Sequence, residues 1–91
     1  METRHDYIEK LSARVREWDA KIDELKGRAE LAKAEVKVRY KQQIVALNED
    51  RDNAKRILSE LYEASDTAWK DVRKRAEELL ADVKDIFKKA A

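Results

Sequence analysis

The stretch LYEASDTAW, at residues 61–69, contains the clearest helix boundary in the chain. Ser65 is of a residue type that caps helix N-termini, and Asp66 would lie against the positive end of the helix dipole. The segments on both sides have the apolar periodicity of helices. We therefore predict a long helix over about 3–62, a turn over 63–66, and a second helix over about 66–89.

Composition leaves helix as the only regular structure. The 91 residues include one glycine and no proline, and 45% of them are charged, so the residues that turns and strands need are scarce. Thirteen of the hydrophobic residues are alanine, which confines the large apolar side chains to a narrow stripe. We predict an all-α fold, one coiled-coil domain over residues 1–91 with a seam rather than a thick core.

Apolar side chains recur at alternating intervals of three and four residues, as a coiled-coil seam requires. Arg51 is the one charged residue at a seam position. The predicted self-association seam consists of Ile8, Leu11, Val15, Trp18, Ile22, Leu25, Ala29, Ala32, Val36, Tyr40, Ile44, Leu47, Arg51, Leu58, Leu61, Trp69, Val72, Leu79, Val83 and Ile86.

The seam can be arranged in layers of three residues. Folding the last helix back at Ser65 places Leu47 opposite Val83, and antiparallel pairing of the two halves of the long helix places Ile22 opposite Leu47. Continuing both pairings gives six layers, each with one residue from each of the three segments. The sequence therefore predicts coiled-coil layers of three helices.

The oligomeric state depends on the second reversal of the chain, which these pairings place between Ala34 and Glu35. The surrounding stretch, LAKAEVK at 31–37, consists of helix formers and contains no turn residue. We also expect the helix to continue through Gly27 and the polar run at 48–53. The favoured interpretation is an exchanged antiparallel homodimer of straight long helices. A monomeric three-helix bundle and other oligomers are the alternatives.

Arg51 falls in the same predicted layer as Trp18. A cation–π contact between them would contribute on the order of 0.5–2 kcal/mol. The alternative is that the guanidinium of Arg51 extends past the seam to solvent.

No residue pattern points to catalysis. His5 is the only histidine, cysteine is absent, and the chain has no glycine-rich phosphate loop. With a single histidine it cannot supply the two Glu-x-x-His motifs of a di-metal site in a helical bundle. We expect no catalytic, cofactor-binding or metal site, and no enzyme activity. The 21 basic and 20 acidic residues are interleaved, which argues against a nucleic-acid partner.

The last helix carries a strong apolar face bordered by basic residues, a pattern that also occurs in helices lying on membranes. Its acidic residues nearly cancel the charge of the basic ones, which weakens attraction to anionic lipid. We therefore favour packing of this helix in the core, and peripheral lipid binding through it is the alternative function. No segment approaches the ~20 apolar residues of a membrane span. The N-terminal residues do not have the pattern of a signal peptide, and we expect a cytoplasmic protein.

Four segments, YIEKL at 7–11, WDAKIDEL at 18–25, YKQQI at 40–44 and ASDTAW at 64–69, carry a resemblance that spans nearly the whole chain. In these the chain resembles a family of short bacterial coiled-coil proteins associated with stress. The resemblance implies a bacterial cytoplasmic setting and a link to the stress response, without catalytic residues or a mechanism. We expect a non-enzymatic structural or interaction protein that acts through self-association, with a further protein partner possible.

Overall fold

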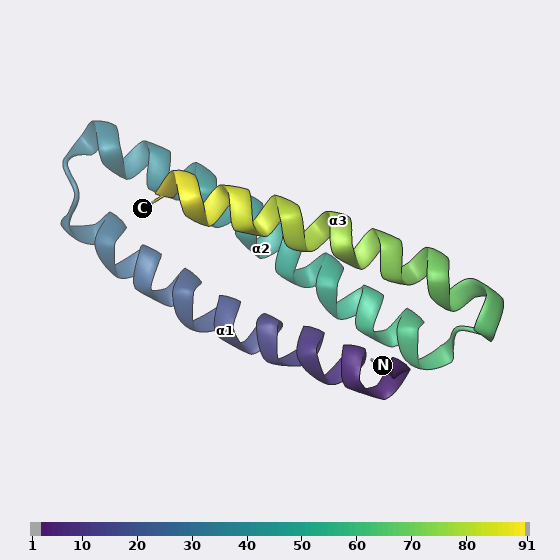
Figure 1. Cartoon of the computed structure of the whole chain (residues 1–91). Helices are drawn as coiled ribbons and strands as arrows, with labels where there is room; N and C mark the ends of the chain where they lie inside the picture. The colour runs from purple at the N-terminus through teal and green to yellow at the C-terminus, as the bar shows by residue number, and fades with distance from the viewer. Residues whose placement is uncertain (1–2, 91) are drawn as a thin grey trace.

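The chain folds into three antiparallel helices in a computed structural model that describes residues 3–90. The helices are α1 (Arg4–Leu31), α2 (Ala34–Glu63) and α3 (Asp66–Ala90). They form an elongated up-down-up bundle with a long dimension of 49 Å (Figure 1). The predicted all-α class and the arrangement of three helices are confirmed.

Side chains cap the starts of α1 and α3. The backbone N–H of Asp6 donates to Oγ1 of Thr3 over 3.1 Å, and the N–H of Thr3 donates back to the Asp6 carboxylate over 3.3 Å. Hydrogen bonding of the Asp6 carboxylate to the side chain and the backbone N–H of Thr3 lowers the pKa of Asp6. At α3, the N–H of Ala68 donates to Oγ of Ser65 over 3.2 Å, which confirms the predicted cap.

The long helix expected over residues 3–62 is divided in two, and this corrects the prediction. Ala32 (φ −81°, ψ 155°) and Lys33 (φ −67°, ψ 156°) are extended between Leu31 and Ala34. This reversal uses no positive φ, so it needs no glycine. The break costs a few helical hydrogen bonds but lets two apolar stripes of one chain pack together.

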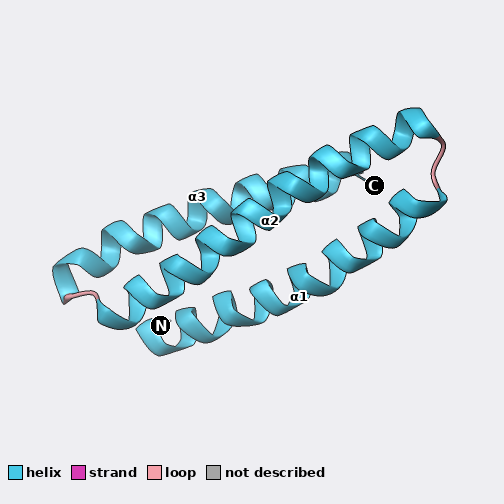
Figure 2. Cartoon of the chain, turned by 180° about the vertical axis from the view of Figure 1, so that it is seen from behind, coloured by secondary structure: helices cyan, strands magenta, loops and turns pink. Residues whose placement is uncertain are grey.

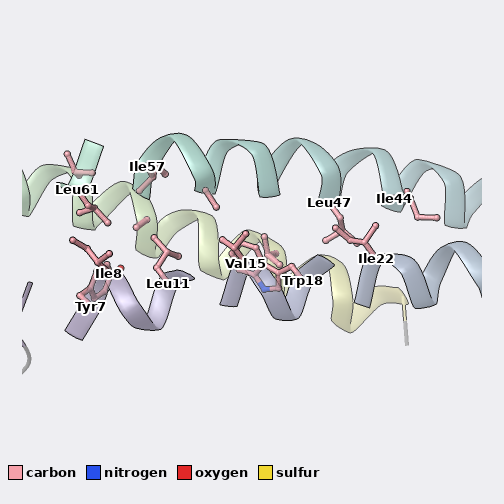
Figure 3. Packing of buried hydrophobic residues seen from close by; sticks show 14 of the residues in the cluster. Tyr7, Ile8, Leu11, Val15, Trp18, Ile22, Ile44, Leu47, Ile57 and Leu61 are labelled. Atoms are coloured by element: carbon pink, nitrogen blue, oxygen red, sulfur yellow. The ribbon is translucent and has the colours of Figure 1, made fainter. Parts of the chain in front are cut away.

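The core consists of the apolar faces that the seam predicted. Figure 3 shows Ile8 beside Leu61 and Ile22 beside Leu47, as the layer pairing requires. The buried residues are Tyr7, Ile8, Leu11, Val15, Trp18, Ile22, Leu25, Ala29, Ile44, Leu47, Ala54, Ile57, Leu61, Val72, Ala76 and Val83. As expected, the helices continue through Gly27 and through the polar run at 48–53.

The helix α2 is the central element of the bundle. Both α1 and α3 pack against it, whereas no Cα atom of α1 within the described range lies within 8 Å of a Cα atom of α3. Long side chains bridge these two helices instead: the rings of Tyr7 and Trp69 meet edge to face at 5.5 Å, and Lys21 lies 5.3 Å from the centre of the Phe87 ring. Figure 2 shows the central place of α2, with α3 and α1 packed against it.

Candidate functional site

The predicted seam forms the core of a single chain. Most of its residues are buried; Tyr40, Leu58, Trp69, Leu79 and Ile86 are partly buried against that core. Val36 is the exception, because it lies in the first turn of α2 after the break and is 40% exposed. Whether the same residues also mediate self-association stays a prediction.

Four core residues are missing from the predicted self-association seam: Tyr7, Ala54, Ile57 and Ala76. Tyr7 and Ile57 directly precede the seam residues Ile8 and Leu58, so the buried face is wider than an alternation of three and four residues predicts. The central position of α2 explains this for Ile57, because a helix that packs against two neighbours needs a broader apolar face. The sequence feature that indicates this wider buried face is a pair of adjacent apolar residues, Tyr7-Ile8 in α1 and Ile57-Leu58 in α2.

Arg51 forms an ion pair instead of the expected cation–π contact. Its Nη1 lies 3.1 Å from Oδ1 of Asp19 on α1, and no cation–π contact with Trp18 occurs in the described part of the chain. Asp19 directly follows Trp18, so Arg51 lies near the predicted layer but its guanidinium pairs with the adjacent carboxylate. A carboxylate is a stronger partner for a guanidinium than a ring face is, which explains the choice.

Asp50 is the titratable group that the fold perturbs most. Burial raises its pKa to about 7, and the Asp82 carboxyl on α3 and then Glu49 act in the same direction. Its Oδ2 is buried without a hydrogen-bond partner among residues 3–90. The Asp82 carboxyl of α3 thus acts on the Asp50 carboxyl of α2 across the contact between these helices.

A groove of about 480 Å³ lies between α1 and α3, where the backbones are far apart. Its floor is apolar and its rim is basic, with Arg14 and Lys21 on α1 and Lys84 on α3. Glu17 partly neutralises this rim, because it lies 3.7 Å from Arg14 and 3.5 Å from Lys21. The groove residues are Arg14, Trp18, Lys21, Leu80, Val83, Lys84 and Phe87.

The end of the α1–α2 hairpin, which we define as residues 26–41, exposes large apolar side chains. Leu31 is 91% exposed and Val38 is 56% exposed. The C-terminus of α3 stops short of the connection in both views of the bundle (Figures 1 and 2). The hairpin end is therefore the part of the described structure that α3 leaves uncovered.

The described residues hold no group of three or more His, Asp or Glu side chains placed to bind a metal ion. None of the helices found in residues 3–90 is long and apolar enough to cross a membrane.

Comparison with known proteins gives no relative. The chain matches no protein-family model, and no curated protein or solved structure is detectably similar to it.

Proposed function

We propose that this protein is a non-enzymatic helical bundle that acts through self-association, by exchanging α1 between two copies. The observation that carries the proposal is the connection between α1 and α2. It consists of two residues, Ala32 and Lys33, and lies inside a run of helix-forming residues.

The connection is held by few local interactions. The N–H of Ala32 donates to the carbonyl of Ala29 over 3.3 Å, and the N–H of Lys37 donates to the carbonyl of Lys33 over 2.8 Å. Lys33 stands at the N-cap of α2 without a side-chain cap. Lysine rarely caps helices, so the start of α2 lacks the stabilisation that a side-chain cap provides. The same stretch would gain backbone hydrogen bonds if it became continuous helix.

Opening this hinge preserves the packing of the bundle. If Ala32 and Lys33 become helical, residues 4–63 form one helix, and α1 of each copy can pack on α2 of the other with the same pairs of core residues. The closed monomer and the exchanged dimer then share one core and differ at the hinge. Concentration and hinge sequence set the balance between them.

The biological setting in the proposal is the bacterial cytoplasm, with a role in stress, and it rests on the sequence resemblance. The charged outer faces of the helices offer surface for a further protein partner. Lipid binding through α3 is less favoured, because Val72, Ala76 and Val83 on its apolar face are buried in the bundle.

The substitution Lys33→Pro tests the exchange. Proline fixes φ near −65°, which matches Lys33, and the extended backbone of Ala32 suits a residue before proline. Neither of the two backbone hydrogen bonds described at the hinge uses the nitrogen of Lys33. The variant therefore fits the closed hairpin but cannot form the continuous helix.

Light scattering coupled to gel filtration, over a range of concentrations, is the measurement. The unmodified protein should shift towards dimer as concentration rises, and Lys33→Pro should remain monomeric. Lys33→Ala is the matched control: it removes the same charge but permits a helix, and it should favour the dimer. Dimers of equal stability in all three proteins would show that α1 is not exchanged.

A further inference from the structure

We propose that the hairpin end is a docking surface for anionic lipid. The closed bundle would bind the membrane with this end facing the lipid surface. This inference goes beyond self-association. It rests on the charge, exposure and position of residues 26–41, and it needs no opening of the helices.

Positive charge is concentrated at the hairpin end. Residues 26–41 contain six basic residues and two acidic ones, a net charge of +4. The whole chain has a net charge of +1, so the remaining residues sum to −3. The basic residues are Lys26, Arg28, Lys33, Lys37, Arg39 and Lys41, and of these Arg28 is paired with Glu24 at 3.0 Å. The interleaved charges of the sequence thus become a polarised molecule once the hairpin forms.

Apolar side chains lie among these cations. Leu31, at the last position of α1, is 91% exposed, and Val36 and Val38 on the first turns of α2 are 40% and 56% exposed. Removing such side chains from water is favourable, and the boundary between lipid headgroups and acyl chains provides a place for them. Lysine and arginine next to them would meet the phosphates of anionic headgroups.

An anionic membrane fits this combination better than nucleic acid does. Single-stranded nucleic acid is bound by aromatic stacking together with cations, and Tyr40, the one aromatic residue of the hairpin end, is partly buried against the core. A phosphate backbone also offers no apolar receptor for Leu31. A lipid surface supplies both the charge and the apolar layer.

The experiment is co-sedimentation with vesicles of phosphatidylcholine plus phosphatidylglycerol, and with vesicles of phosphatidylcholine alone. The protein should bind the first and bind the second at least about tenfold more weakly, and added salt should weaken binding. The test variant is Lys33→Glu/Arg39→Glu/Lys41→Glu. Its matched control is Lys55→Glu/Lys70→Glu/Lys74→Glu, which changes the net charge equally at other exposed positions.

The hairpin-end variant should lose at least about tenfold in lipid affinity, and the control about twofold or less. Leu31→Asp should also lose about tenfold. Tyr62→Asp, at an exposed apolar side chain near the opposite end of α2, should have little effect. Circular dichroism checks that the variants remain helical, and light scattering reports their oligomeric state separately.

Failure to bind either kind of vesicle would overturn the inference. Equal losses in the two triple variants would indicate a general charge effect, and equal losses in Leu31→Asp and Tyr62→Asp would exclude insertion of the hairpin end. Binding to an acidic peptide or to nucleic acid without vesicle binding would assign the surface to another class of partner.

Discussion

The Nε–H of Arg4 donates to the carbonyl oxygen of Leu61 over 2.9 Å, which ties the start of α1 to the end of α2. Nη2 of the same guanidinium donates to the carbonyls of Leu61 and Ala64. The last carbonyls of a helix lack helical hydrogen-bond partners and lie at the negative end of its dipole. A guanidinium there donates hydrogen bonds to these carbonyls and also interacts favourably with the dipole. Arg4 also lies 5.8 Å from the centre of the Trp69 ring, and thereby contacts all three helices.

Arg4→Ala should lower the free energy of unfolding by about 1–3 kcal/mol, because it removes charge-assisted hydrogen bonds to carbonyls at the end of a helix. Urea denaturation followed by circular dichroism measures this. Arg16→Ala, at an exposed position of α1, is the control and should cost less than about 0.5 kcal/mol. Equal effects in the two variants would mean that the Arg4 contacts contribute nothing specific.

Gly27→Ala should stabilise the protein by about 0.5–1 kcal/mol. Gly27 lies within α1, and a Cβ atom added there meets nothing within 4 Å, so the substitution gains helix propensity without a clash. Thermal unfolding should show a higher midpoint. An unchanged or lower midpoint would indicate that this position is not helical in solution.

Asp19 and Arg51 should be coupled in a double-mutant cycle. The pair is partly exposed, with side-chain exposures of 45% for Asp19 and 24% for Arg51, so a coupling of about 0.5–1 kcal/mol is expected. The cycle with Trp18→Leu and Arg51→Ala should be closer to additive, because the guanidinium contacts the carboxylate and not the ring. Stronger coupling of Arg51 to Trp18 than to Asp19 would contradict the observed geometry.

Asp50→Asn should change how stability depends on pH. Because the pKa of Asp50 rises from 3.8 to about 7 on folding, the folded state holds a proton that the unfolded state has released. The contribution of this group is fully present below about pH 4 and is lost as the pH rises through 7. At pH 8 the variant should exceed the original protein in stability by on the order of 1–2 kcal/mol, after allowance for partial solvation.

Urea denaturation of both proteins at pH 4 and pH 8 provides the measurement. The stability difference between them should be small at the lower pH and appear at the higher one. Asp71→Asn, at an exposed position of α3, is the control and should show no such pH-dependent gain. A difference that is the same at both pH values would mean that folding does not raise the pKa of Asp50.

The sequence predicted the helices and their pairing well, because apolar spacing determines which face of each helix is buried. The cap at Ser65 and the opposition of Ile22 and Leu47 follow from local residue type and from that spacing. The break at Ala32–Lys33 could not be predicted in the same way, because no residue there requires it. Burial between distant segments outweighs local helix propensity at this point.

The exposed hairpin end was also not predictable from composition. Leu31, Val36 and Val38 look like ordinary members of a helical pattern, and in a continuous helix the basic residues around them would lie in the middle of the rod. Only the reversal brings these cations to one end of the bundle. The Asp50–Asp82 contact likewise needs the third helix to bring together residues 32 positions apart.

The central place of α2 has a consequence for how the molecule opens. The backbones of α1 and α3 each pack against α2, whereas α1 and α3 meet one another only through long side chains such as Tyr7–Trp69 and Lys21–Phe87 among the described residues. We therefore expect either outer helix to detach while the other stays paired with α2. Amide hydrogens of α2 should therefore exchange with solvent most slowly, and those of α1 and α3 should exchange through separate openings. A chain built of two neighbouring hairpins, with most contacts between adjacent elements, should also fold quickly.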